Sequence, residues 1–145
     1  MQDFPHHYRV AASAGAEDDV ILRADGLPEI ATAAPAEFGG PGDRWSPESL
    51  LVAAVGDCFV LGFRAIARAS KLEWAAIHCD VTGVLDRVER QLRFTELQVR
   101  ASLTVPEGTD TTKADRLLHK AEETCLITNS LSATVTLTTD VSTAA

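Results

Sequence analysis

The sequence predicts an α+β domain, and three features of its patterning carry that prediction. A long apolar segment without proline follows Ser46-Pro47 and predicts a helix, two later segments alternate apolar and polar residues as strands do, and a second helical repeat comes after them. The resulting order of strands, long helix, strand pair, helix and strand is that of an α+β fold. No repeat, linker or low-complexity segment interrupts the chain, so we expect one domain over residues 1–145.

The N-terminal third predicts short strands around a glycine-rich loop. Residues 8–14 and 20–24 have strand-like composition, and the acidic stretch 16–19 between them predicts a turn. Residues 28–33 are expected to add a third strand. Glycine and proline are so dense at 39–43 that no regular element is expected there.

The first helix has a well-marked beginning. Ser46 is a favourable cap, Pro47 occupies the first helical position, and the charge of Glu48 suits the positive end of the helix dipole. The helix is expected to continue to about Lys71. Alanine, leucine and valine cover nearly all faces of its first half, which is typical of a buried helix.

The remaining elements follow from period-two and helical patterns. The charged segment between the two long strands suits a hairpin, and Thr109 or Asp110 can cap the second helix. The expected elements are strands at 74–86, 91–105 and 132–141, a hairpin connection at 87–90 and a helix at 109–123.

Composition excludes several classes of partner. The net charge of -8 disfavours nucleic acid and anionic membranes, because both would be repelled. No N-terminal segment resembles a signal peptide. The longest apolar stretch, 50–61, is interrupted by Gly56-Asp57 and is shorter than the ~20 residues that a membrane span needs. We therefore expect a cytoplasmic protein without a nucleic-acid or membrane partner.

Three cysteines lie far apart in the sequence, at 58, 79 and 125, which is not a secreted disulfide framework. Cys79 falls on the inward side of a predicted strand and is expected to pack as a small apolar residue. The residues alone leave Cys58 open between a packing role and a reactive thiol. Cys125 follows the second predicted helix, where a thiol can be partly exposed and can approach another.

The segments 39–42, 46–51 and 53–54, followed by Cys58-Phe59, resemble the signature of the OsmC/Ohr family. That signature has a glycine-rich loop, a helix that starts with Pro-Glu-x-Leu, and a cysteine ten residues after the glutamate. The family's second cysteine begins a short segment after the next helix, often Cys-Pro-x-Ser-x, and here that segment is 125–131. The order of elements matches from about Tyr8 to Val141. The resemblance implies an OsmC-like fold with antiparallel sheets, a long buried central helix and a second helix.

The resemblance also implies a reaction. The Cys58 thiolate would attack an organic hydroperoxide and become a sulfenic acid, Cys125 would condense with it to a disulfide, and an external thiol or dithiol would reduce the pair. Apolar neighbours such as Leu51, Val55 and Phe59 would favour alkyl or lipid hydroperoxides. The family's peroxidases need no cofactor, and we expect none.

The resemblance further implies an intertwined homodimer with sites at the subunit interface. Ten helical residues separate Glu48 from Cys58 by about 15 Å, so a glutamate that serves the Cys58 site must come from a second chain. The places where family members carry an arginine hold Asp18 and Phe38 in this sequence. Arg44 is therefore the nearest substitute for the thiolate partner.

Several alternatives stay open. Arg9 and Arg23 are further candidates for the arginine that stabilises the Cys58 thiolate. The chain is expected to act as a peroxidase. The second hypothesis is an OsmC-like dimer that has no peroxidase activity and binds an apolar small molecule at the subunit interface. Adjacent histidines at 6–7 lack a third ligand, and no zinc-site spacing is present in the sequence, so no metal is expected.

Overall fold

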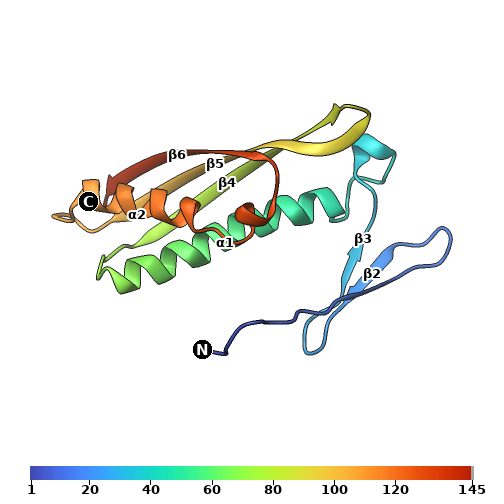
Figure 1. Cartoon of the computed structure of the whole chain (residues 1–145), viewed down its shortest axis with the longest axis horizontal. Coiled ribbons are helices and arrows are strands. Elements are labelled where there is room, and N and C mark those ends of the chain that lie inside the picture. Colours follow the sequence, from blue (N-terminus) through green and yellow to red (C-terminus); the bar gives the residue numbers. More distant parts are fainter. Residues whose placement is uncertain (145) are drawn as a thin grey trace. The chain divides into compact units, whose positions relative to one another are not determined.

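The chain of the computed structural model runs through two units, Met1–Leu50 and Leu51–Ala145, and the structure describes residues 1–144 (Figure 1). Each unit has its own sheet. The prediction of one domain over residues 1–145 stays a prediction beside this division. The elements of the N-terminal unit are β1 (Ala11–Ser13), β2 (Val20–Arg23), β3 (Ile30–Thr32) and the 3-10 turn η1 (Ala36–Phe38).

The N-terminal sheet is antiparallel in the order β1-β2-β3. The three expected strands are confirmed, although β1 is shorter than the predicted 8–14. The expected loop over 39–43 is confirmed as well. At Gly40 an added Cβ would lie 1.7 Å from the carbonyl oxygen of Ala34, so this turn of the loop accepts only glycine.

The long helix α1 (Pro47–Ala69) begins where the sequence predicts. The amide of Ser49 donates to the Ser46 hydroxyl at 3.1 Å, and the amide of Ser46 donates to the Ser49 hydroxyl at 2.9 Å. This reciprocal pair is a capping box in which serine takes the place of the usual glutamate. Because it satisfies two free amide groups, it fixes the register of every side chain that follows on α1.

The end of α1 is set by a left-handed residue. Lys71 has a φ of 56°. The amide of Leu72 donates to the carbonyl of Ala67 at 2.9 Å, and the amide of Lys71 donates to the carbonyl of Arg68 at 3.2 Å. These two bonds make a Schellman motif with lysine where glycine is usual. The buried side chain of Leu72 supplies the apolar contact that accompanies such an ending.

The C-terminal unit continues with β4 (Ala76–Val88), β5 (Gln91–Val105), α2 (Thr111–Glu123), the 3-10 turn η2 (Thr128–Ser130) and β6 (Thr134–Thr143). Strands β4 and β5 form the expected antiparallel hairpin. Its turn is tight, because Glu89 and Arg90 both adopt positive φ angles of 50° and 70°. Asp110, one of the two predicted caps, accepts the amide of Lys113 at 3.1 Å at the start of α2.

The expectation of purely antiparallel sheets needs one correction. In the sheet β4-β5-β6, strand β6 pairs with β5 in parallel. The reason is the connection: α2 carries the chain back along the sheet, so β6 starts at the same end as β5, as in a β-α-β unit. The fold is α+β, as the sequence predicts.

The core of the C-terminal unit lies between the two helices and one face of its sheet (Figure 1). Alternate residues of β5 are buried, and those between them are more exposed, because strand side chains point to opposite faces. Both helices present buried side chains at spacings of three or four residues. The buried core residues are Val55, Phe59, Phe63 and Ala67 of α1, Leu97, Val99, Ala101, Leu103 and Val105 of β5, and Ala114, Leu117, Leu118 and Ala121 of α2, with Leu72 beside them.

Within one chain, α1 is buried along a single stripe rather than on all sides. Its fully buried residues are Val55, Phe59, Phe63 and Ala67, whereas Leu61 is 51% exposed. The expectation of a helix buried all round is therefore not met within this chain, because the sheet and α2 cover only one side of it. Length and composition alone would let α1 cross a bilayer, a criterion that core helices of water-soluble proteins also meet. Asp57 does not interrupt α1, and the expectation of a chain without a membrane partner stays a prediction.

Candidate active site

Cys58 lies in the middle of α1, beside its buried stripe. It is half-buried, and the same side of the helix carries Leu51 seven residues earlier and Ala54 four residues earlier. All of these neighbours are apolar, whereas the adjacent Asp57 is exposed on another face. The regular helix therefore holds the Cys58 sulfur in a fixed, partly apolar position.

Cys125 lies directly after α2, at the entry to η2, and is only 4% exposed. The amide of Asn129 donates to the Cys125 carbonyl at 3.0 Å. Two polar side chains also donate to the backbone here, the Thr128 hydroxyl to the Cys125 carbonyl at 3.2 Å and the Ser130 hydroxyl to the Leu126 carbonyl at 2.8 Å. This local network bends the chain sharply and turns several amides inward.

The fold brings Cys58 and Cys125 together, with their side chains in hydrogen-bonding contact. Burial raises the pKa of the Cys58 thiol, the neighbouring Cys125 raises it further, and the amides of Ile127 and Leu126 oppose this; the net pKa is raised. Burial also acts to raise the pKa of Cys125. Bonds from the Thr128 amide and hydroxyl, from Cys58 and from the Ile127 amide outweigh that effect, so the pKa of Cys125 is lowered.

Cys79 of β4 is a third thiol in the same unit. Burial raises its pKa to about 11, and the charges of Asp80 and of Cys125 contribute. The residue is half-buried and lines a cavity of about 380 Å³ together with Gly56, Asp57 and other residues of α1 and β4. Its expected role as a packed apolar residue agrees with this raised pKa, because a thiol of that kind is largely protonated near neutral pH.

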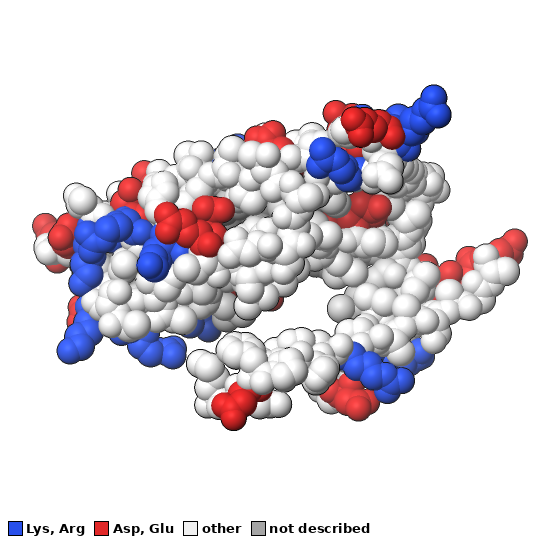
Figure 2. Space-filling model, in the orientation of Figure 1, with Lys and Arg blue, Asp and Glu red and all other residues white. Residues whose placement is uncertain are grey.

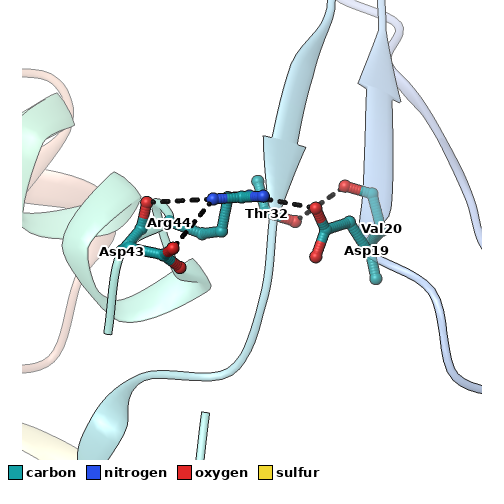
Figure 3. Close-up of polar contacts among 5 residues, drawn as sticks. All are labelled: Asp19, Val20, Thr32, Asp43 and Arg44. Atoms are coloured by element: carbon teal, nitrogen blue, oxygen red, sulfur yellow. Dashed lines mark hydrogen bonds and ion pairs between the residues drawn. The ribbon is translucent and has the colours of Figure 1, made fainter. Parts of the chain in front are cut away.

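Arg44 lies in the N-terminal unit and is already engaged with two carboxylates (Figure 3). Its Nε donates to Asp19 at 3.0 Å, and its Nη1 lies 3.2 Å from the carboxylate of Asp43. The hydrogen bond that the guanidinium donates to Asp19 and the charges of both carboxylates raise the pKa of the guanidinium. Next to this pair, the Thr32 hydroxyl donates to the Val20 carbonyl at 3.1 Å and ties β3 to β2.

Glu48 lies in the first turn of α1, in the N-terminal unit. Its Oε1 is buried without a hydrogen-bond partner among the described residues. The side chain borders a cavity of about 520 Å³ that is lined mainly by apolar residues, among them Val20, Leu22, Phe38 and Leu50. A buried carboxylate oxygen without a donor is costly, and the described residues offer none to this oxygen of Glu48.

The structure thus joins two of the four predicted site residues, Cys58 with Cys125. Sequence reasoning missed the contribution of the 126–128 turn, whose amides and Thr128 hydroxyl point to the sulfurs. One signal could have found it: the family pattern Cys-Pro-x-Ser places a hydroxyl three residues after the cysteine, and Thr128 stands there. Within residues 1–144, no group of three or more His, Cys, Asp or Glu side chains could hold a metal ion, and the absence of a cofactor stays a prediction.

Comparison with known proteins places this geometry in a family. The uncharacterised protein YmaD of Bacillus subtilis is 24% identical over 141 residues, with 94% of each chain covered. A solved OsmC-like protein of unknown function from Vibrio cholerae has a TM-score of 0.83 at 18% identity and covers 94% of this chain and 99% of its own. An organic hydroperoxide resistance protein OsmC from Legionella pneumophila has a TM-score of 0.73 at 25% identity, with 95% and 99% covered.

The match of the OsmC-like protein family model carries the assignment. It runs over residues 40–140, from the glycine-rich loop to the last strand, and so includes both helices and both cysteines of the thiol pair. These residues are more than half of the sequence, and the chain belongs to the OsmC-like protein family.

Proposed function

We propose that this protein is a thiol-dependent peroxidase that reduces organic hydroperoxides through Cys58 and Cys125. The contact between these two thiols, which lie 67 residues apart in the sequence (125 − 58), is the observation that supports it most directly. Two thiols that meet can form a disulfide, and a sulfenic acid beside a second thiol is trapped before it is over-oxidised. Three of the relatives by fold are named as organic hydroperoxide resistance proteins, one of them with bound thiocyanate.

The proposed cycle balances as follows. The Cys58 thiolate attacks the outer oxygen of the hydroperoxide and the O–O bond breaks, so that Cys58 becomes a sulfenic acid. The alkoxide that leaves takes a proton from solvent and becomes the alcohol. The Cys125 thiol then attacks the Cys58 sulfur, which expels water and forms the disulfide. An external dithiol, or two thiols, reduce that disulfide and are themselves oxidised to a disulfide.

A homodimer completes the proposal. Glu48 and Arg44 would reach the Cys58 site from the partner subunit, and the buried Glu48 oxygen has no hydrogen-bond partner among the described residues. Exposed apolar residues such as Leu61 and Leu126 give a second chain something to cover. On the face shown in Figure 2, charged side chains gather toward the two ends of the C-terminal unit and leave a largely uncharged area between them. We place the protein in the cytoplasm, where the thiols stay reduced between cycles.

One observation favours a second candidate, an OsmC-like dimer that binds an apolar small molecule without peroxidase activity. The guanidinium of Arg44 is held by Asp19 and Asp43, so it must leave both carboxylates before it can serve a thiolate. The two candidates differ in a single measurable property, the rate at which hydroperoxide is consumed.

Stopped-flow consumption of cumene hydroperoxide, with dithiothreitol as reductant, tests the proposal. We expect rapid consumption by the wild type and none by Cys58→Ser. Cys79→Ser, a matched control in the same unit, should keep the wild-type rate. Cys125→Ser should form the sulfenic acid once and then over-oxidise, which mass spectrometry detects as added oxygen. Equal, slow consumption by the wild type and Cys58→Ser would refute the peroxidase and leave the second candidate.

Arg44 has a separate test. We expect Arg44→Ala to raise the pKa of Cys58, measured by the pH dependence of its alkylation, and Arg44→Lys to raise it less. An unchanged pH dependence in Arg44→Ala would exclude this arginine as the thiolate partner.

A further inference from the structure

The C-terminal unit has one basic end, although the net charge of the whole chain is -8. Residues 61–72 contain three cations and no carboxylate, and three further cations share one face of α2 because they are spaced three and four residues apart. Figure 2 shows Lys and Arg side chains gathered around this end of the unit, where α1 ends and α2 begins. The basic end consists of Arg64, Arg68, Lys71, Lys113, Arg116 and Lys120, of which Lys113 is half-buried and the others are exposed.

The cations of the basic end have no ionic partner within residues 1–144. No carboxylate there lies within 4.0 Å of any of them, whereas Arg44 in the other unit has two such partners. Asp115, which lies among them on α2, is engaged elsewhere, because it accepts the hydroxyl of Thr139 and lies 3.5 Å from His119. Unpaired charges of one sign produce a local positive potential that attracts an anionic partner.

A contact between the two helices joins their cations into one surface. The ammonium group of Lys113 donates to the carbonyl of Ser70 at 2.8 Å, across 43 residues of sequence. This carbonyl lies at the C-terminal end of α1, where free carbonyl groups and the helix dipole favour a cation. The first turn of α2 is therefore held beside the residues that follow α1, including Lys71.

The basic end lies close to the thiol pair on both helices. Arg64 follows Cys58 by six residues of α1, which is about 9 Å along the helix axis, and Lys120 precedes Cys125 by five residues. A protein that rests on both helices would extend over the thiol pair. Cys58 is half-buried and Cys125 is only 4% exposed, so a thiol that arrives from outside reaches the Cys58 sulfur more readily.

We propose that the basic end is the docking surface for an acidic protein that carries the dithiol which reduces the Cys58–Cys125 disulfide. This inference rests on the proposed peroxidase function, in which an external dithiol is the reductant. The six cations line neither the cavity beside Cys79 nor the one beside Glu48, so exposed helix faces rather than a pocket receive the partner. A nucleic acid or an anionic membrane would extend beyond the basic end and meet the acidic remainder of the chain.

The reduction at this surface is an ordinary thiol–disulfide exchange. A thiolate of the docked dithiol attacks the Cys58 sulfur, the Cys58–Cys125 bond breaks, and Cys125 leaves as a thiolate. The second thiolate of the dithiol then attacks its own partner sulfur in the mixed disulfide and releases Cys58 as a thiolate. The dithiol gives up two protons and two electrons and becomes a disulfide, and the two released thiolates take up two protons.

Two synthetic dithiol peptides test the surface. Each has two cysteines separated by two residues, flanked in one peptide by six glutamates and in the other by six glutamines. The disulfide is formed beforehand with diamide in a Cys79→Ser background, so the test does not depend on peroxidase activity. Reduction is followed by quenching, alkylation of the freed cysteines and mass spectrometry.

We expect the glutamate peptide to reduce the disulfide about tenfold faster than the glutamine peptide at low ionic strength. The net charge of -8 by itself predicts the opposite order, because it repels the glutamate peptide. The preference should fall below about twofold at about 1 M salt, where the screening length is about 3 Å. This comparison needs no substitution in the basic end, so it stands even where a variant does not fold.

Charge reversal locates the surface. Arg64→Glu combined with Arg68→Glu, and separately Arg116→Glu combined with Lys120→Glu, should each abolish the preference for the glutamate peptide. The rates of both peptides are compared on the same variant, so a change in the intrinsic reactivity of the disulfide cancels.

The matched control is Arg87→Glu combined with Arg90→Glu, which makes the same change of charge at the exposed turn between β4 and β5 and should keep the preference. Equal loss in the control would show a general effect of charge and overturn the proposal, as would a wild type that prefers the glutamine peptide or neither peptide.

Two further outcomes would assign the basic end to another partner and also overturn the proposal. One is a change of oligomeric state in the basic-end variants, measured by sedimentation, without a peptide preference in the wild type; the surface would then join copies of this chain. The other is binding of the wild type to phosphatidylglycerol vesicles, lost in these variants, again without a peptide preference. A wild type that consumes no hydroperoxide would refute the peroxidase, while the peptide comparison still decides the docking surface.

Discussion

The thiol of Cys79 makes the stability of the C-terminal unit depend on alkaline pH. It lies on the inward side of β4, half-buried, and burial raises its pKa from 9.0 to about 11, with smaller contributions from the charges of Asp80 and Cys125. In the unfolded chain the same thiol ionises near its ordinary value. Between these two pKa values the unfolded state loses its proton while the folded state keeps it, so unfolding becomes more favourable as the pH rises.

The sign and size follow from this difference. For an acid whose folded pKa is raised, the stabilisation is complete below the unfolded pKa and is lost as the pH rises to the folded pKa. Two pKa units at about 1.36 kcal/mol each would give about 2.7 kcal/mol. Cys79 is only partly buried and solvent screens its charge, so we expect about 1–2 kcal/mol.

Urea unfolding of the wild type and Cys79→Val, in the presence of reductant, measures this effect. Valine has a similar volume and suits a strand, so its own effect on the free energy of unfolding should be the same at every pH. We expect the difference between the two proteins to shift by about 1–2 kcal/mol in favour of Cys79→Val between about pH 7 and about pH 11. A difference that stays constant with pH would refute the assignment of a raised pKa to Cys79.

Three further predictions concern the packing and the helix caps. Phe63→Ala should destabilise the protein by about 3–5 kcal/mol, because Phe63 is 0% exposed, and an unchanged urea midpoint would contradict this. Gly83→Ala should cost about 1–3 kcal/mol in unfolding free energy, since its Cβ would lie 2.7 Å from Cγ2 of Val52; a loss below about 0.5 kcal/mol would show that the packing there yields easily. Asp110→Ala should cost about 1 kcal/mol by removing the cap on the Lys113 amide, and Asp110→Asn should retain most of the stability in thermal unfolding.

Most elements were predictable because their signals are local. The Ser46 cap and Pro47 fixed the start of α1, and the period-two pattern of residues 91–105 matches β5 to the residue. The parallel pairing of β6 was not predictable in this way. It depends on where α2 returns the chain, and a strand's own residues carry no signal for the direction of its neighbour.

The candidate site also has one part that the sequence could predict and another that it could not. The resemblance to the family pointed to Cys58 and Cys125 by position in the sequence. The donors of the 126–128 turn could not be read in advance, because amides have no sequence signature and become directed only when η2 bends the chain. The engagement of Arg44 with Asp19 is equally non-local, since 25 residues separate the two in the sequence.

The sequence by itself determined the α+β class, the cap of the first helix, the inward faces of the long strands and the family signature around Cys58, because each of these depends on residue types at short spacing. Only the tertiary structure decided that the two thiols meet, that a turn of amides surrounds them, and that α1 is covered along one stripe. The physical reason is that thiol chemistry depends on which donors and charges lie within a few ångströms of the sulfur. Those neighbours come from segments whose approach is set by packing rather than by position along the chain.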